Sequence, residues 1–154
     1  MEERLLQPEE LHLLKDGMKK LSAYHNTVKT HPDFEFRPIY VDVALERLRK
    51  AIPMGNAKVK VLEEGGQVIG FMVIDLDGEN RKGVLNWVFV EETYRGQGYG
   101  GRLMDWAMEE FEAIQAEQID LNVVCGNPAV GLYEKYGFAP RTIQMTKCIK
   151  NDIK

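Results

Sequence analysis

An apolar strand that runs through a glycine-rich loop into a helix, near the middle of the chain, constrains the fold more than any other feature. Residues Val84–Val90 are mostly apolar on both faces, which is typical of a strand with neighbours on either side. From about Gly98 onward apolar residues return at helical spacing, among them Leu103, Ala107 and Phe111. We therefore expect a central strand and an amphipathic helix that packs on its sheet.

Helical and strand patterns precede this junction. Helical spacing of apolar residues predicts two amphipathic helices, Pro8–Val28 and Val41–Ile52, joined by a proline-containing loop at Thr30–Pro38. Val59 and Val61 alternate with lysines, a glycine pair follows at 65–66, and Val68–Ile74 is an apolar, β-branched run; together they predict a β-hairpin. The helices come first, so they have to pack on a sheet formed later in the chain.

The remaining segments continue the alternation of helices and strands. Asp75–Gly83 is rich in turn residues and separates the hairpin from the central strand. After the long helix we expect a strand at Leu121–Cys125, a short helix at Ala129–Tyr136 closed by Gly137, and a final strand at Ile143–Ile149. The order predicts a mixed fold without internal repeats.

Composition narrows the classes of protein. The 154 residues, 44% of them hydrophobic and 29% charged, suit a single domain over residues 1–154. We expect an α/β fold of the mixed α+β kind, with a central twisted sheet and helices on both faces. The net charge of −4 gives no reason to bind nucleic acid, and without an apolar run of about 20 residues we expect no membrane partner and a cytoplasmic location. Cys125 and Cys148 have no metal-ligand spacing, so we expect no metal.

The glycine cluster at the junction predicts a phosphate-binding segment. Gly96, Gly98, Gly100 and Gly101 lie within six positions. Glycine lets a ligand approach the backbone, and the N-terminus of a helix offers unpaired N–H groups and the positive end of its dipole. The structural alternative, a tight turn with close helix packing, explains one or two glycines better than four.

Two phosphate-binding fingerprints compete with this interpretation. Gly96, Gly98 and Gly101 satisfy the dinucleotide pattern G-x-G-x-x-G. In that fold the first glycine follows its strand almost directly and a carboxylate ends the next strand, whereas here Glu91–Arg95 intervene and Asp120 begins a strand. The P-loop pattern is absent, so we expect no nucleotide hydrolysis and keep dinucleotide binding as an alternative.

Two motifs in the second half of the chain carry a resemblance to a known family. Arg95-Gly96-Gln97-Gly98-Tyr99-Gly100 is similar to the Gln/Arg-x-x-Gly-x-Gly/Ala motif of the GNAT superfamily of acetyl-CoA-dependent N-acetyltransferases. Asn127–Phe138 is similar to that family's segment Asn-x-x-Ala…Leu-Tyr-x-x-x-Gly-Phe. The motifs cover about Val84–Ala139, while Pro8–Ile52 shares only its two helices with the family. The resemblance implies a GNAT-like fold and acetyl-CoA as cosubstrate.

The resemblance also implies where acetyl-CoA binds. Its diphosphate would lie on the N–H groups of Arg95 to Gly101, and its pantetheine arm would extend along the strand Val88–Val90 as an added strand does. The implied cofactor-binding residues are Val88, Phe89, Val90, Arg95, Gly96, Gln97, Gly98, Tyr99, Gly100, Gly101 and Asn127. An N–H near Val90 would stabilise the oxyanion that forms during attack. Two of these residues have an alternative to cofactor binding. The side chain of Arg95 could simply be solvated, and Asn127 could only mark the beginning of a helix.

Tyr133 is the implied catalytic residue. It matches the tyrosine with which members of the family protonate the departing CoA thiolate. A phenol with a pKa of about 10 and a thiol with a pKa of about 8.5 are close enough for that role. In the alternative interpretation, Tyr133 only packs beside Leu132 and Tyr136.

No general base can be named. Several members of the family carry a glutamate on the strand before the glycine loop, where this chain has Asn86, whose amide does not accept a proton at neutral pH. Glu35, Asp75 and Glu79 lie in segments that could border the acceptor site directly or through water, or they are solvated.

Three weaker patterns have structural alternatives that we prefer. The run 75–78 has the composition of a calcium loop but lacks its later ligands, so we expect a turn. Cys125 could carry an acyl group, although free cysteines are usually just buried. His25 and His31 flank the first inter-helix loop and would either touch an acceptor or play a structural part.

The sequence therefore predicts an enzyme that transfers an acetyl group from acetyl-CoA to a primary amine by direct attack. The acceptor would be a small molecule or a peptide, in a pocket shaped by Thr30–Pro38 and the segment after Gly137. Acidic residues mildly favour a cationic amine; they are Asp33, Glu35, Glu91 and Glu92. The rival is a non-catalytic acyl-CoA-binding or regulatory domain. A homodimer stays open.

Overall fold

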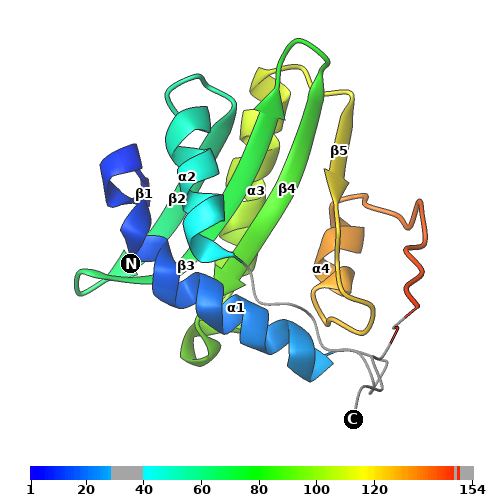
Figure 1. Ribbon diagram of the computed structural model, residues 1–154, viewed down its shortest axis with the longest axis horizontal. Coiled ribbons are helices and arrows are strands. Elements are labelled where there is room, and N and C mark those ends of the chain that lie inside the picture. Colours follow the sequence, from blue (N-terminus) through cyan, green and yellow to red (C-terminus); the bar gives the residue numbers. More distant parts are fainter. Residues whose placement is uncertain (29–39, 148, 150–154) are drawn as a thin grey trace.

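A five-stranded sheet lies at the centre of the computed structural model, which describes residues 1–28, 40–147 and 149. The strands are β1 (Glu2–Leu5), β2 (Ala57–Glu64), β3 (Gln67–Asp77), β4 (Lys82–Val90) and β5 (Gln118–Leu121), and they lie side by side in that order (Figure 1). The first four strands pair antiparallel, whereas β4 and β5 are parallel. The sheet is therefore mixed.

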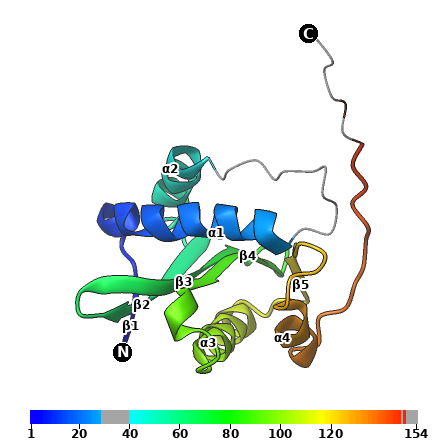
Figure 2. The same ribbon diagram turned by 90° about the horizontal axis from the view of Figure 1, so that it is seen from below.

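Helices cover both faces of the sheet, as Figure 2 shows. The 3-10 helix η1 (Pro8–Leu14) and the helices α1 (Lys15–Val28) and α2 (Val41–Ala51) lie on one face, and α3 (Tyr99–Ala113) and α4 (Val130–Lys135) lie on the other. A short 3-10 helix, η2 (Glu92–Tyr94), connects β4 to the loop before α3. The predicted fold class is confirmed.

Alternating side chains of the strands form two apolar cores. In β3, Phe71 and Val73 pack in the core under α1 and α2, while Met72 and Ile74 pack in the core under α3 and α4. All four side chains are inaccessible to solvent. Strand β4 has neighbours on both sides, as its apolar pattern predicts. The strand that leads into the glycine segment is thus fixed by the sheet and by both helix layers.

Two glycines allow helices to approach the sheet closely. A Cβ atom on Gly17 of α1 would lie 2.6 Å from Phe71 Cε1, and one on Gly83 of β4 would lie 2.3 Å from the ring of Phe111. Both distances are far below van der Waals contact, so a larger residue would displace an aromatic ring. The sequence contains no local signal for these contacts, because each joins elements that are distant along the chain.

Several predicted elements are confirmed. The hairpin and the helix at Val41–Ile52 form as expected, and α4 is followed by Gly137 with a φ of 89°, a value that favours glycine. The expected helix Pro8–Val28 begins as a 3-10 helix and becomes α-helical only at Lys15. Most of the expected turn at Asp75–Gly83 is strand, since the turn occupies only residues 78–81.

One strand is not predicted by the sequence pattern, and two strand predictions need correction. The charged segment Glu2–Leu5 forms β1 at the edge of the sheet, where one neighbour suffices and an apolar alternation is not needed. Strand β5 ends at Leu121 instead of beginning there. Within the described part of Ile143–Ile149 no strand forms, and Ile143 and Met145 are 88% and 89% exposed, because their alternating pattern finds no paired neighbour.

Candidate active site

The candidate site begins where β4 and β5 separate. Toward β3, β4 stays paired up to its last residue, Val90, which lies opposite Gly70. Toward β5 the pairing ends at Leu85, which lies opposite Leu121. The β3–β4 ladder shifts register at this point, and Asn86 is the additional residue on β4. Among the residues that the structure describes, none forms a strand neighbour on this edge of residues 86–90 (Figure 1).

Main-chain groups of Val88 and Val90 point to this open edge. The N–H of Glu91 donates to the carbonyl of Ile69 at 2.8 Å, on the β3 side. Because successive residues of a strand direct their main-chain groups to opposite sides, Val88 and Val90 face away from β3. Their side chains pack against the core under α3, whereas Phe89 is buried in the core under α1.

The glycine segment turns the chain from β4 into α3. Gly96 and Gly98 have φ angles of 78° and 86°, so both adopt a backbone conformation that favours glycine. Gly98 is the N-cap of α3 and offers no side-chain cap to the helix. Gln97 folds back, and its Nε2 donates to the carbonyl of Thr93 at 3.3 Å. The turn therefore requires two of the four glycines.

Six consecutive N–H groups, those of residues 96–101, donate to no acceptor in the part of the chain that the structure describes. The preceding N–H, of Arg95, donates to the carbonyl of Glu92 at 3.2 Å. The array of free N–H groups is therefore one residue shorter than expected and starts at Gly96 instead of Arg95. The first backbone bond of α3 goes from Arg102 to Gly98 at 3.1 Å. The array lies at the positive end of the α3 dipole.

Neither the turn nor packing within the protein accounts for Gly100 and Gly101. Their φ angles are not positive. A Cβ on Gly100 would meet Leu132 Cδ2 at 3.5 Å, an ordinary contact, and one on Gly101 would lie 4.0 Å from Tyr136 Oη. The alternative of turn and close helix packing thus explains Gly96 and Gly98 but leaves these two glycines unexplained.

Tyr133 lies on α4 and is buried in the core under α3, against which Val88 also packs. Its side chain is 7% exposed, and its ring packs edge-on against Phe138 with 6.3 Å between centroids. Burial raises the pKa of its phenol above the ordinary value. The hydroxyl donates to no group among residues 1–28, 40–147 and 149.

A second tyrosine on this side, Tyr136, ties the end of α4 to the first turns of α3. Its hydroxyl lies 2.5 Å from Asp105 Oδ1 and 3.1 Å from the carbonyl oxygen of Gly101. The hydrogen bond to Asp105 and partial burial raise the pKa of Tyr136 to about 12. Sequence analysis mentioned this residue only as a neighbour of Tyr133.

Asn127 lies in the turn that precedes α4. Its Oδ1 accepts a hydrogen bond from the N–H of Ala129, the N-cap of α4, at 2.9 Å, which closes a local turn two residues before the cap. This contact uses the oxygen and leaves the Nδ2 group for another partner. The side-chain oxygen of Asn127 therefore has a structural part, in the turn that leads into α4.

The carboxylates considered as general bases are engaged or lie elsewhere. Asp75 accepts hydrogen bonds from Arg47, at 2.9 Å, and from Asn86. Glu79 is an exposed residue of the turn between β3 and β4, and Glu35 lies outside the described residues. Neither Asp75 nor Glu79 is brought to the open edge of β4 as an unpaired carboxylate.

The remaining candidates lie as follows. Cys125 is exposed. His25 on α1 is half-buried, which lowers its pKa, and His31 lies outside the described residues.

Asp77 accepts hydrogen bonds from the N–H and side chain of Asn80 and closes the β3–β4 turn, and these hydrogen bonds lower the pKa of its carboxyl group. Among the described residues, no cluster of histidines, cysteines and carboxylates could hold a metal ion.

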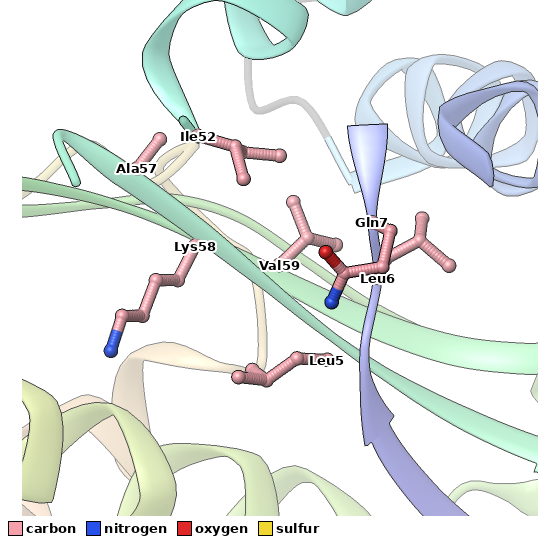
Figure 3. A pocket seen from close by; sticks show the side chains of 7 residues that line it. All are labelled: Leu5, Leu6, Gln7, Ile52, Ala57, Lys58 and Val59. Carbon is pink, nitrogen blue, oxygen red and sulfur yellow. The ribbon is translucent and has the colours of Figure 1, made fainter. Parts of the chain in front are cut away.

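A pocket elsewhere in the molecule is separate from this site. Figure 3 shows it between β1, the end of α2 and the start of β2, with Ile52 and Val59 among its lining residues. Its residue Ala57 lies opposite Asp75, which lies opposite Val84 near the beginning of β4. The glycine segment follows the other end of β4, so the pocket is not part of the candidate site.

The chain is similar to a known family in sequence and to solved structures in fold. Residues 55–140 match the family described as the acetyltransferase (GNAT) domain. A tetramutant of the BH1408 protein of Bacillus halodurans superimposes with a TM-score of 0.74 at 18% identity, over 97% of this chain and 100% of that chain. No curated protein matches the chain.

Two acetyltransferase structures share the fold. A GCN5-related N-acetyltransferase from Ralstonia eutropha JMP134 superimposes with a TM-score of 0.70 at 19% identity, over 96% of this chain and 97% of that chain. A Trypanosoma brucei acetyltransferase gives a TM-score of 0.67 at 20% identity, over 96% and 99% of the two chains. Within the residues described here, no helix is long and apolar enough to cross a membrane.

Proposed function

This chain belongs to the GNAT acetyltransferase family, and from that premise we propose that it moves an acetyl group from acetyl-CoA to a primary amine by direct attack. The observation that carries the proposal is the array of unpaired N–H groups at residues 96–101. Hydrogen-bond donors at the positive end of a helix are suited to an anionic diphosphate. Gly100 and Gly101, which the fold does not require, keep the approach to these donors free of side chains.

The open edge of β4 extends this site toward the reacting group. The pantetheine arm, which carries amide groups, pairs with the main chain of Val88 and with the N–H of Val90 as an added strand, since Arg95 occupies the Val90 carbonyl. The Val90 N–H faces that edge and is the nearest candidate for stabilising the oxyanion. The cofactor thus uses backbone groups that β5 leaves unpaired beyond Leu85.

The chemistry forms one bond and breaks another at the thioester carbon. The amine nitrogen attacks that carbon and its electron pair forms the C–N bond; the intermediate then collapses with cleavage of the C–S bond. Tyr133 donates its proton to the sulfur as this bond breaks, and the nitrogen loses a proton to water or to a base. The products are an amide and free CoA thiol.

The timing of the proton transfer follows from the two acidities. A phenol pKa of about 10 and a thiol pKa of about 8.5 set the transfer to a free thiolate at about 2 kcal/mol uphill. Burial raises the pKa of Tyr133 and increases this difference. The transfer is therefore completed only as the CoA thiol departs and Tyr133 takes up a new proton from solvent, two steps that draw the unfavourable transfer forward.

A non-catalytic acyl-CoA-binding domain is the second candidate. It is favoured by one observation: of the described carboxylates considered as bases, Asp75 is bound by Arg47 and Asn86, and Glu79 lies in the β3–β4 turn. Both candidates bind the cofactor, so binding alone does not separate them. Turnover does.

Calorimetry with acetyl-CoA, CoA, a longer acyl-CoA and NAD tests the cofactor. We expect binding of the CoA compounds and none of NAD; binding of NAD alone would replace the proposal with dinucleotide binding. A panel of primary amines, assayed by release of the CoA thiol, then tests transfer. Cofactor binding without thiol release across cationic, neutral and peptide amines would favour the non-catalytic domain.

A further inference from the structure

The side chain of Arg95 turns back from the glycine segment onto α1. Its Nε donates to the carbonyl of Val90 at 2.8 Å. Its guanidinium carbon lies 4.7 Å from the centroid of the Tyr24 ring, within the range of a cation–π interaction. Arg95 therefore connects the end of β4, the beginning of the glycine segment and α1.

A second contact joins the same two parts of the molecule. Lys20 Nζ lies 2.6 Å from Glu91 Oε1, and Asp16 Oδ2 lies 3.1 Å from the same amine. Lys20 and Tyr24 are four residues apart on α1 and so lie on one side of the helix. Glu91 and Arg95 are the N-cap and the C-cap of η2. Helix α1 thus holds both ends of the turn that precedes the glycine segment.

The place of Arg95 along the chain makes its contacts important for the site. Its guanidinium occupies the Val90 carbonyl, which faces the open edge of β4. The array of free N–H groups starts at Gly96, the residue that follows Arg95. The guanidinium therefore sets how the array is placed relative to the open edge. A diphosphate that binds several N–H groups at once is sensitive to that placement, because hydrogen bonds weaken when distance and angle depart from their optimum.

We propose that Tyr24 is a positioning residue for acetyl-CoA: its ring holds the guanidinium of Arg95, and Arg95 in turn holds the glycine segment in register with the open edge of β4. The inference rests on the proposed function. Exposed ion pairs and cation–π contacts add little to the stability of a whole fold. The effect of losing them should therefore appear in cofactor affinity and not in global unfolding.

Calorimetric dissociation constants for acetyl-CoA test the role of the ring. We expect Tyr24→Leu to weaken binding about three- to fivefold, which is what an exposed cation–π contact provides. Tyr24→Phe keeps the aromatic face and should bind within about twofold of the wild type. Equal losses in both variants would assign the effect to the hydroxyl and overturn the inference.

A double-mutant cycle tests whether Tyr24 acts through Arg95. If it does, Tyr24→Leu should cause no further loss of affinity in an Arg95→Gln background. Additive losses would mean that the two side chains act separately, and would overturn the inference. Lys20→Gln should weaken binding in the same direction, whereas Lys19→Gln, a neighbouring exposed lysine, is the matched control and should not.

Thermal unfolding of each variant separates positioning from damage to the fold. Should Tyr24→Leu fail to fold, Lys20→Gln changes an exposed side chain and provides the decisive comparison with Lys19→Gln. If the wild type binds acetyl-CoA and the Tyr24 and Lys20 variants bind it equally well, the positioning role of Tyr24 is overturned and the proposed function is not. A wild type that does not bind acetyl-CoA overturns the proposed function and this inference together.

Discussion

The two edges of β4 differ in how far they are paired. Toward β3 the ladder continues from Lys82 to Val90, whereas toward β5 it ends at Leu85. The long edge fixes the strand in the sheet, and the short edge releases the main chain of residues 86–90 for another partner. One strand can therefore stabilise the fold and offer a binding surface, since its two edges do not have to share a neighbour over the same length.

Glycines repeat this contrast. Gly83 lies in the paired part of β4, where the ring of Phe111 occupies the space that a Cβ would need. Gly101 lies beyond the open part, and a Cβ there would come no nearer than 4.0 Å to the protein. The first glycine is required by packing within the fold. The second is not, and the proposal assigns its free space to a ligand.

The largest effect is expected on kcat, from a substitution of Tyr133. Tyr133→Phe removes the proposed proton donor, and we expect kcat to fall about 100-fold, a typical contribution of general acid catalysis. The dissociation constant of acetyl-CoA should stay nearly unchanged, since the ring still fills its place beside Phe138. Steady-state kinetics with a responsive amine, combined with calorimetry, measure both quantities.

Tyr136→Phe is the matched control for this prediction. It removes the hydroxyl of the residue that follows α4, which binds Asp105 and the carbonyl of Gly101 and has no proposed chemical role. If both variants lose the same activity, the loss reflects the position of α4. An unchanged kcat in Tyr133→Phe would remove the proposed acid.

The paired edge should respond in stability alone. Gly83→Ala places a methyl group 2.3 Å from the ring of Phe111, and we expect the free energy of unfolding to fall by about 1–3 kcal/mol, as in other overpacked cores. Urea unfolding measures the change. Gly78→Ala, in the β3–β4 turn where a Cβ meets nothing within 4 Å, should cost much less. The folded Gly83→Ala protein should still bind acetyl-CoA with normal affinity; a large loss of affinity would mean that the two edges are not independent.

Gly101→Ala should move stability and affinity in opposite directions. Alanine has the higher helix propensity, so the free energy of unfolding should rise by up to about 1 kcal/mol. Acetyl-CoA binding should weaken about tenfold, or about 1.4 kcal/mol, because the methyl group obstructs the N–H array. Gly131→Ala on α4, where a Cβ also meets nothing within 4 Å, should stabilise without affecting binding. Equal affinities for the two variants would argue against a ligand at Gly101.

The fold and the N–H array could be predicted because their signals are local. Hydrophobic period identified the helices, the hairpin and the central position of β4, and the spacing of the glycines identified the turn into α3. The charged segment Glu2–Leu5 has no such pattern, because its place as β1 depends on the edge of β2. Likewise, the apolar alternation of Ile143–Ile149 does not form a strand in the described residues without a paired neighbour.

The supports of the site could not be predicted from local pattern. Lys20 and Glu91 are separated by 71 positions, and Tyr24 is a similar distance from Arg95. Sequence analysis assigned Arg95 to the cofactor or to solvent, while the structure places its guanidinium on Tyr24 and on the Val90 carbonyl. Such contacts depend on where α1 crosses the sheet, which residue types and spacing do not determine.

The smallest effect concerns the connection between α4 and α3 and appears only in strongly alkaline solution. The pKa of Tyr136 in the folded protein, about 12, exceeds the ordinary value of about 10. A raised pKa means that the hydrogen bond to Asp105 contributes fully below pH 10 and that this contribution is lost as the pH rises through 12. The difference in free energy of unfolding between wild type and Tyr136→Phe should therefore be constant near neutral pH and shrink between pH 10 and 12. In an Asp105→Asn background, which lacks the carboxylate, urea unfolding should show a weaker pH dependence; the same dependence in both backgrounds would assign the raised pKa to burial and not to Asp105.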